Sequence, residues 1–413
     1  MLGTTHIAAL YVGRTLIGFA NGFLMTFGQL YLQEVTPARY RGMSISFFTV
    51  WTSLGSLVGT IVDNFTSKVT SRASYMIPLG LIYIVPGIIS VGLLIIPESP
   101  RWLVQHGNIE KARKALEWLR PDQETVEIEL REMQIAIESE KQMVRGAAWM
   151  DMFRNPVDRR RTIISVASVT TQAACGAMYL LAYGTYFFEM AKVGNAFENS
   201  CILVSVGVVA ILINLGIIVP YGRRRVFITA GLIICAICQL IMAIVYTIHP
   251  GTVGTGKATV SISVIYLVVY NGAIGPFAWL AGGEVPSQRL RSYTFGLAAA
   301  VGFLGAWLAT FTAPYFINPS SLNWGPKYGF IWFPSGLIAA AFIYFYLPET
   351  KDRTLEEIDE MFEAKVPARK FRRYQCMISV VAKAKSIAND EAVNTSEKPV
   401  MDGTVQIIED VKV

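Results

Sequence analysis

The chain has 413 residues and a formal net charge of +6; 53% of its residues are hydrophobic and only 16% are charged. Charged residues approach a quarter of a soluble globular domain, so this composition excludes a soluble globule and indicates a protein embedded in a lipid bilayer. The placement of the charges between apolar segments is therefore more informative than their sum.

The apolar segments predict membrane-spanning helices. About nine runs are near twenty residues long, which is enough to cross roughly 30 Å of hydrocarbon as helices that satisfy their own backbone hydrogen bonds. In chain order they lie near 8–31, 43–63, 76–96, 162–189, 197–219, 226–247, 259–282, 292–317 and 327–347. We therefore expect an all-α polytopic membrane protein.

Basic residues between the runs predict the topology. They gather on alternate sides of successive spans, at Arg39 and Arg41, in segment 101–161, at Arg223 to Arg225, at Arg289 and Arg291, and in the C-terminal tail. Because arginine and lysine mark the cytoplasmic side, these segments and the C-terminus are predicted to be cytoplasmic. With about nine spans, Met1 is then expected on the opposite side.

Two charged phrases each occur twice. "QEVTPARYRG" begins at residue 33, and "GEVPSQRLRS" repeats its glutamate and two arginines at the same spacing about 250 residues later. "PESPRW" at 97–102 and "PETKDR" at 348–353 lie almost the same distance apart. The common offset predicts two homologous halves in parallel repeat. By that symmetry three helices and roughly 90 residues are missing before the first phrase, so a fragment or misstarted product is favoured over a nine-span variant.

The same markers divide the chain into four predicted regions. Residues 1–100 form the remainder of an N-terminal bundle with three spans, and residues 162–348 form a C-terminal six-helix bundle. Between them, residues 101–161 carry amphipathic helical patterns with interleaved acids and bases, which indicate a cytoplasmic helical linker. Residues 349–413 are predicted to be a cytoplasmic tail that is largely disordered after residue 371.

The repeated charges predict a cytoplasmic gate. Charge at the membrane boundary is costly and is normally paired, and it often marks moving parts. Glu34 and Glu284 are expected to pair with arginines of neighbouring helices, while Glu98 and Glu349 accept from the repeated arginines. The predicted gate residues are Glu34, Arg41, Glu98, Arg101, Arg223, Arg224, Glu284, Arg291 and Glu349. The alternative is that the arginines only anchor the topology.

Residues 8 to about 363 resemble the sugar-porter branch of the major facilitator superfamily. The resemblance lies in "GRTLIGFANG" with Arg14, "YLQEVTPARYRG", "PESPRWL", "GRRR", "GPFAWLAGGEVPSQRLRS" and "PETKDRTLEEIDEMF". "TQAACG" at 171–176 is most similar to fungal maltose and α-glucoside permeases. The resemblance implies a major facilitator fold of two pseudo-repeated helical bundles, with about nine of twelve membrane helices present.

The resemblance also implies where a sugar binds. Sugar porters carry two glutamines and an asparagine in the seventh helix, and here Gln172 keeps the first amide while Ala173 or Ala174 and Met178 replace the others. Trp279 matches the cavity tryptophan of the tenth helix. The candidate substrate residues are Gln172, Thr171, Trp279, Thr49 and Asn271. An interhelical hydrogen bond is the alternative role for Gln172, and packing is the alternative for Trp279.

The expected function is secondary active or facilitative transport of an α-glucoside or hexose-like sugar across the plasma membrane, with or without coupling to protons. The alternatives are a nutrient sensor that does not transport, a carrier of a less hydroxylated specialised metabolite, and a non-functional truncated carrier. The chain's His6, His106 and His249 are scattered and no acids cluster with a nucleophile, so we expect neither an enzyme nor a metal site, cofactor or nucleic-acid partner.

Overall fold

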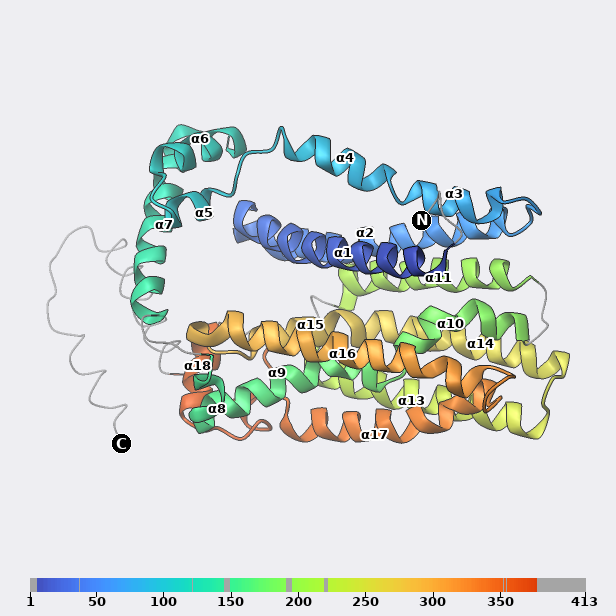
Figure 1. Ribbon diagram of the computed structural model, residues 1–413. Coiled ribbons are helices and arrows are strands. Elements are labelled where there is room, and N and C mark those ends of the chain that lie inside the picture. Colours follow the sequence, from blue (N-terminus) through green and yellow to red (C-terminus); the bar gives the residue numbers. More distant parts are fainter. Residues whose placement is uncertain are drawn as a thin grey trace, which may run out of the picture. The chain divides into compact units, whose positions relative to one another are not determined.

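The computed structural model describes residues 6–36, 38–120, 122–144, 149–190, 195–218, 222–351, 353 and 355–376. Within these ranges every regular element is a helix, which confirms the all-α prediction (Figure 1). Eight helical segments of the described chain are long and apolar enough to cross a membrane. They are Ile7–Gly28, Ala73–Leu93, Pro156–Glu189, Ala196–Gly216, Arg224–Ile248, Val253–Glu284, Arg291–Ile317 and Gly325–Tyr346.

The first part of the chain forms long apolar helices. α1 (Ile7–Val35) ends at Thr36, whose extended backbone suits the position before a proline. α2 (Ala38–Thr66) contains the predicted run 43–63, and the predicted run 76–96 is divided into α3 (Ala73–Leu81) and α4 (Ile84–Leu93). None of the residues in the spans of α1 and α3–α4 is buried, so their apolar side chains are available to lipid.

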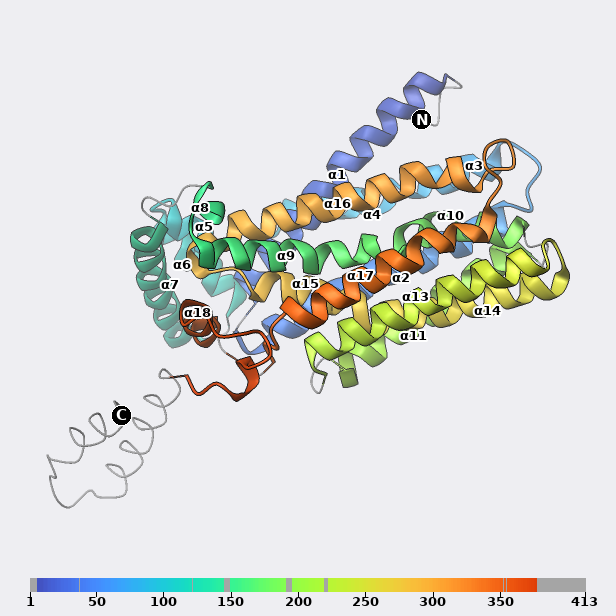
Figure 2. The same cartoon turned by 90° about the horizontal axis from the view of Figure 1, so that it is seen from below.

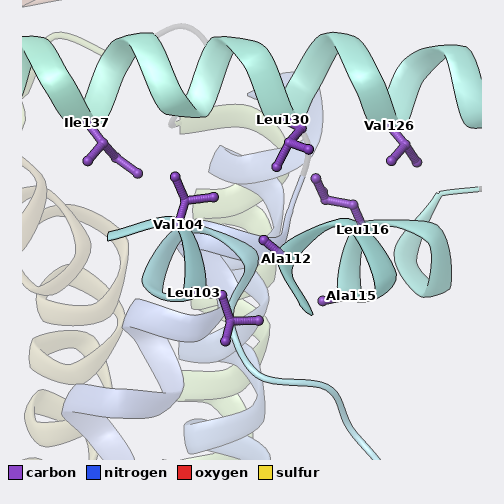
Figure 3. Packing of buried hydrophobic residues seen from close by; sticks show 8 residues of the cluster. All are labelled: Leu103, Val104, Ala112, Ala115, Leu116, Val126, Leu130 and Ile137. Atoms are coloured by element: carbon purple, nitrogen blue, oxygen red, sulfur yellow. The ribbon is translucent and has the colours of Figure 1, made fainter. Parts of the chain in front are cut away.

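The predicted linker folds as a small helical cluster of its own. α5 (Pro100–Gln105) is capped by Ser99, whose side chain accepts from the Trp102 backbone, and it is followed by α6 (Ile109–Leu119), α7 (Gln123–Val144) and the short α8 (Asp151–Arg154). Figure 3 shows α7 side chains pointing toward those of α5 and α6. The buried cluster comprises Leu103, Val104, Ala112, Ala115, Leu116, Val126, Leu130 and Ile137. The amphipathic pattern thus buries its apolar stripe.

The second bundle contains six of the candidate spans of the described chain. Its helices are α9 (Pro156–Ala174), α10 (Ala177–Met190), α11 (Ala196–Ile213), α13 (Arg224–Ile248), α14 (Val253–Val269), α15 (Gly275–Glu284), α16 (Arg291–Ile317) and α17 (Gly329–Tyr346). Both α9 and α10 belong to one span, as do α14 and α15. α9 packs against α15 and α16, while α13 packs against α14 and α17 (Figures 1 and 2).

Two kinds of helix interruption shape this bundle. Between α9 and α10, Gly176 has φ +78°, and a Cβ at this position would lie 2.7 Å from Cγ of Trp332. Only glycine fits both the left-handed backbone and the close approach of the indole. The other interruptions are π-helical turns, Asn214–Ile218 after α11 and Tyr270–Ile274 between α14 and α15. Such turns change the facing of side chains in the middle of a span.

The chain divides into two compact units, Met1–Leu347 and Pro348–Val413, so the predicted first three regions lie within the first unit. In the second unit, Arg353 donates to the carbonyl oxygens of Phe371, Arg372 and Tyr374 at 3.3, 3.4 and 2.7 Å. These bonds fasten the segment after α18 (Leu355–Glu363). Defined structure therefore continues past residue 371, where disorder was predicted, to Cys376; residues 377–413 lie outside the described chain.

Replacing Arg353 with alanine is expected to expose Cys376. The thiol is fully buried, and its pKa is raised by burial and secondarily by Glu360, so it should react slowly with maleimide. Loss of the bonds made by Arg353 should raise the labelling rate about tenfold, which corresponds to about 1.4 kcal/mol of lost local stability. Mass spectrometry of the labelled peptide measures this rate. Exposed Lys370→Ala is the control and should leave the rate unchanged.

Candidate functional site

The first copies of the two doubled phrases meet at the end of α1. The Ser99 hydroxyl donates a short hydrogen bond to the carboxylate of Glu34, and the Tyr31 hydroxyl donates to the carbonyl of Pro97 at 3.0 Å. Ser99 also caps α5, so one serine joins the start of the linker to the acid of the first phrase. The partner of Glu34 predicted from sequence was an arginine such as Arg101; the structure instead gives it a hydroxyl donor.

An arginine of the linker reaches the same helix end. Arg120 Nη2 donates to the carbonyl oxygen of Val35 at 3.1 Å, and Arg120 Nε forms an ion pair of 3.0 Å with Glu129. The side chains of Arg120 and Glu129 are 10% and 23% exposed, so solvent screens this pair only in part. A carbonyl at a helix C-terminus has no partner within the helix, and the guanidinium satisfies it.

The second copy of the phrase carries an ion pair. Arg224 Nη2 at the start of α13 lies 2.7 Å from Glu284 Oε1 at the end of α15, and the two side chains are 16% and 19% exposed. Of the two arginines that sequence offered, Arg224 is therefore the partner, while Arg223 is the exposed residue before α13. The pair joins two helices of the same bundle, whereas the sequence hypothesis required pairs that form when the two halves close.

Val285, the next residue of the second phrase, has an arginine contact like that of Val35 in the first phrase. The Val285 carbonyl accepts from Nε of Arg161 at 2.8 Å, and Arg161 is buried in the first turns of α9. Ser165, one turn later, donates to the Gly282 carbonyl at 2.6 Å. Both copies of the Glu-Val pair therefore end with a carbonyl held by an arginine from outside the phrase. Sequence analysis missed Arg120 and Arg161 because neither belongs to the repeat.

The repeated arginine Arg289 has acidic partners in α8 and in the first turn of α9. Arg289 lies 3.7 Å from Asp151 of α8 and 3.4 Å from Asp158 of α9. Sequence analysis proposed Glu98 and Glu349 as acceptors for the repeated arginines. Glu98 is instead exposed and accepts from the backbone of Ser99 at 3.3 Å. Glu349 belongs to the second unit, where it accepts from the Lys351 backbone at 3.4 Å.

For the other predicted gate residues, the structure gives a position in the fold or leaves the side chain outside the described residues. The side chain of Arg41 lies outside the described residues, as does that of the substrate candidate Thr49. Arg101 follows the first residue of α5, and Arg291 begins α16. Arg14, from the family motif, is exposed on α1.

The contacts of Arg120 with the end of α1 predict that this arginine affects solute uptake, whereas an exposed ion pair of the linker should not. Arg120→Ala should lower the rate of solute uptake about tenfold, since removal of a charge-assisted hydrogen bond costs about 1.5–3 kcal/mol and frees the end of α1. Arg113→Ala is the matched control, because Arg113 and Glu127 pair at 3.2 Å on the same two linker helices while 50% and 56% exposed. Equal uptake by the two variants at equal surface expression would contradict the prediction.

A buried amide lies halfway along the span formed by α9 and α10. The hydroxyl of Tyr270, in the π-helical turn, donates to Oε1 of Gln172 at 3.0 Å. Within the described residues, Nε2 of Gln172 is buried and has no hydrogen-bond partner. A buried donor left without an acceptor costs about 1–3 kcal/mol. An acceptor that reached Nε2 would remove this cost.

The other substrate candidates make contacts with their surroundings. The Thr171 hydroxyl donates to the Ser168 carbonyl at 2.6 Å, and Thr171 is buried. Asn271 Nδ2 donates to the Gly207 carbonyl of α11 at 3.3 Å. Trp279 packs between two rings of α16, with centroid distances of 5.9 Å to each of Phe295 and Phe303.

Sequence analysis missed Tyr270 although it selected the neighbouring Asn271. The available signal was a tyrosine and an asparagine side by side in an apolar run, shortly before Pro276. In the described chain no three His, Cys, Asp or Glu side chains are grouped as metal ligands. Cys235 and Cys238 are both buried, and the Cys235 thiol lies 3.8 Å from the Tyr266 carbonyl.

The chain is similar to several known proteins. Residues 1–362 match the family model described as "Sugar (and other) transporter". The chain is 32% identical over 384 residues to the maltose permease MAL61 of Saccharomyces cerevisiae, covering 90% of this chain and 62% of the permease. It is 29% identical to the major facilitator-type transporter ecdD of Aspergillus rugulosus, covering 87% of this chain and 68% of that one.

One further relative and a solved structure extend the comparison. The high glucose sensor RGT2 of Saccharomyces cerevisiae is 30% identical, covering 86% of this chain and 48% of the sensor. The chain thus spans about half to two thirds of the length of these relatives. A structure of the proton:xylose symporter XylE has a TM-score of 0.61 at 21% identity, covering 81% of this chain and 70% of that one.

Proposed function

The chain belongs to the sugar transporter family of the major facilitator superfamily, and from this premise we propose that it carries a sugar, α-glucoside or hexose-like, by alternating access. The observation that carries the proposal is the unpaired amide donor of Gln172, buried halfway along a membrane span. A sugar offers many acceptor oxygens. A sugar oxygen that accepts a hydrogen bond from this buried donor adds to the affinity and specificity of binding.

The ionic contacts at one end of the helices support a moving carrier. The Arg224–Glu284 pair and the arginine contacts to Val35 and Val285 strengthen the helix ends within each bundle. Rigid bundles can then rock against each other about a solute held at the midplane. Basic residues between the spans support a cytoplasmic side for these helix ends and for the C-terminal tail, and the proposed uptake implies the plasma membrane. We propose that transport is coupled to protons, since the similar structure of XylE is described as that of a proton:xylose symporter.

Contacts between the two bundles support the same mechanism. α2 packs against α11, and Cys201 lies 3.3 Å from the Thr60 carbonyl. Near the end of this interface, Lys68 and Glu198 pair at 3.5 Å, each more than half exposed. An exposed pair contributes about 0–1 kcal/mol, which is weak enough to break in each cycle. The interface is therefore suited to reversible separation.

Uptake and binding measured on the full chain test the proposal. Labelled maltose and glucose are supplied to cells that lack their own sugar carriers, and thermal stabilisation of the purified chain by the same sugars reports binding. We expect saturable uptake that competes with unlabelled sugar. Binding without uptake, at normal surface delivery, would favour a sensor; absence of both would overturn the proposal.

A further inference from the structure

We propose that Tyr270 is a specificity-determining residue: its hydroxyl holds the Gln172 amide so that only N–H donors face the solute. The inference rests on the proposed function and defines the ligand chemistry of the same site. It predicts that the solute group next to Gln172 is a hydrogen-bond acceptor, such as a ring oxygen, a glycosidic oxygen or the lone pair of a hydroxyl.

The orientation of the amide follows from the inventory of donors and acceptors. A phenol has one proton to donate, and within the described chain Gln172 is the sole hydrogen-bond partner of the Tyr270 hydroxyl. If the amide turned over, Nε2 would face the hydroxyl and the phenol proton would lose its acceptor. Tyr270 is 6% exposed, so water is a poor substitute. The phenol therefore favours the orientation with Oε1 toward it and Nε2 away from it.

Tyr270 is itself held in place. Its ring is parallel to that of Tyr266, with 6.5 Å between centroids, and the Tyr266 hydroxyl donates to the Cys175 carbonyl at 2.9 Å where α9 ends. Two residues further on, the Gly272 carbonyl accepts from Nδ2 of Asn214 at 2.6 Å. These contacts fix the π-helical turn on both sides of the ring. A positioned hydroxyl can orient an amide that free rotation would otherwise leave adaptable.

The two residues that follow Gln172 are alanines, so this part of α9 carries no second side-chain amide. Ala173 is buried against Gly305, where a Cβ on the glycine would lie 3.2 Å from the Ala173 methyl. Position 174 is also an alanine. With no amide carbonyl at either position, the α9 side of the site offers donors, and discrimination there depends on the solute's acceptors.

Binding of sugar analogues can show whether the protein presents a hydrogen-bond donor or an acceptor to the solute. In a deoxyfluoro sugar the C–F group accepts weakly and cannot donate, and in a deoxy sugar the corresponding C–H group does neither. At one ring position, the wild-type chain should bind the fluoro analogue about tenfold more tightly than the deoxy analogue, as expected for one retained hydrogen bond. Tyr270→Phe frees the amide to present its oxygen, so this ratio should fall toward one while the parent sugar still binds.

Tyr183→Phe is the matched control, since it removes from the span of Gln172 a phenol that donates instead to the Thr310 carbonyl at 3.3 Å. It should keep the wild-type ratio. A Tyr270→Phe ratio equal to that of Tyr183→Phe, with the wild type binding sugar, would overturn the inference and leave the proposed function intact. A wild-type chain that binds none of the sugars would overturn the proposed function and this inference with it.

Discussion

Replacing Glu284 with glutamine is expected to abolish solute uptake while leaving sugar binding close to that of the wild type. The substitution removes the negative charge 2.7 Å from Arg224 and leaves that arginine, 16% exposed, without its carboxylate. Removing one partner of a buried pair costs about 3–5 kcal/mol, and this partly exposed pair lies toward the lower end of that range. Because the pair joins α13 to α15 within one bundle, its loss loosens a bundle that must move as a rigid body between the two states.

Binding should persist because Gln172 lies halfway along its span, whereas Glu284 lies at a helix end. The measurements are uptake of labelled sugar and thermal stabilisation by sugar, at matched surface expression. Glu127→Gln is the control, because that residue pairs with Arg113 on the linker surface while 56% exposed. A double reversal, Arg224→Glu with Glu284→Arg, should restore part of the uptake. Undiminished uptake by Glu284→Gln would reject a role for the pair in transport.

The sequence was sufficient for the helices and for one of the ion pairs. Apolar runs of span length predict membrane helices directly, because a backbone in hydrocarbon has few alternatives. The repeated Glu-Val phrase identified Glu284, and the adjacent arginine run offered Arg224 as a neighbour. Both lie at predicted ends of spans on the same side, so topology alone brings them within reach.

Contacts made by the linker could not be predicted in the same way. Arg289 pairs with Asp151 and Asp158, and the Val35 carbonyl accepts from Arg120, because of where α8, the start of α9 and the end of α6 lie against their neighbours. Amphipathic periodicity predicts which face of such a helix is buried, but it leaves the neighbour undetermined. The hydroxyl bond between Ser99 and Glu34 was missed for a related reason, since charge matching considers only arginines as partners.

The π-helical turn at Tyr270–Ile274 was equally inaccessible from the sequence. An extra residue within a helix shifts the facing of every later side chain by about a third of a turn, and no periodic pattern signals it in a uniformly apolar span. As a result, sequence analysis chose Asn271, which bonds to the α11 backbone, over Tyr270, which bonds to Gln172. Polar side chains in a membrane bundle are assigned correctly only when the helix facing is known.

Substituting alanine for Gly329 is expected to destabilise the second bundle severely. Gly329 begins α17, and a Cβ there would lie 2.5 Å from the backbone oxygen and 3.2 Å from the carbonyl carbon of Gln239 in α13. A backbone atom cannot turn aside as a side chain can, so the two helices must separate. Gln239 is fully buried and its amide accepts a short hydrogen bond from Tyr179, so separation also strains a polar contact.

Overpacking of this kind costs about 1–3 kcal/mol, and the loss of close packing between α13 and α17 adds to it. The expected result is a lower midpoint of thermal aggregation, read by size-exclusion chromatography of the detergent-solubilised chain after heating. Gly296→Ala in α16 is the control, because a Cβ there meets nothing within 4 Å. Alanine in a helix is favoured over glycine by about 0.5–1 kcal/mol, so this variant should be as stable as the wild type or more so. Equal stability of the two variants would show that α17 can move away from α13 without loss, and would contradict the close packing on which the position of Trp332 over Gly176 depends.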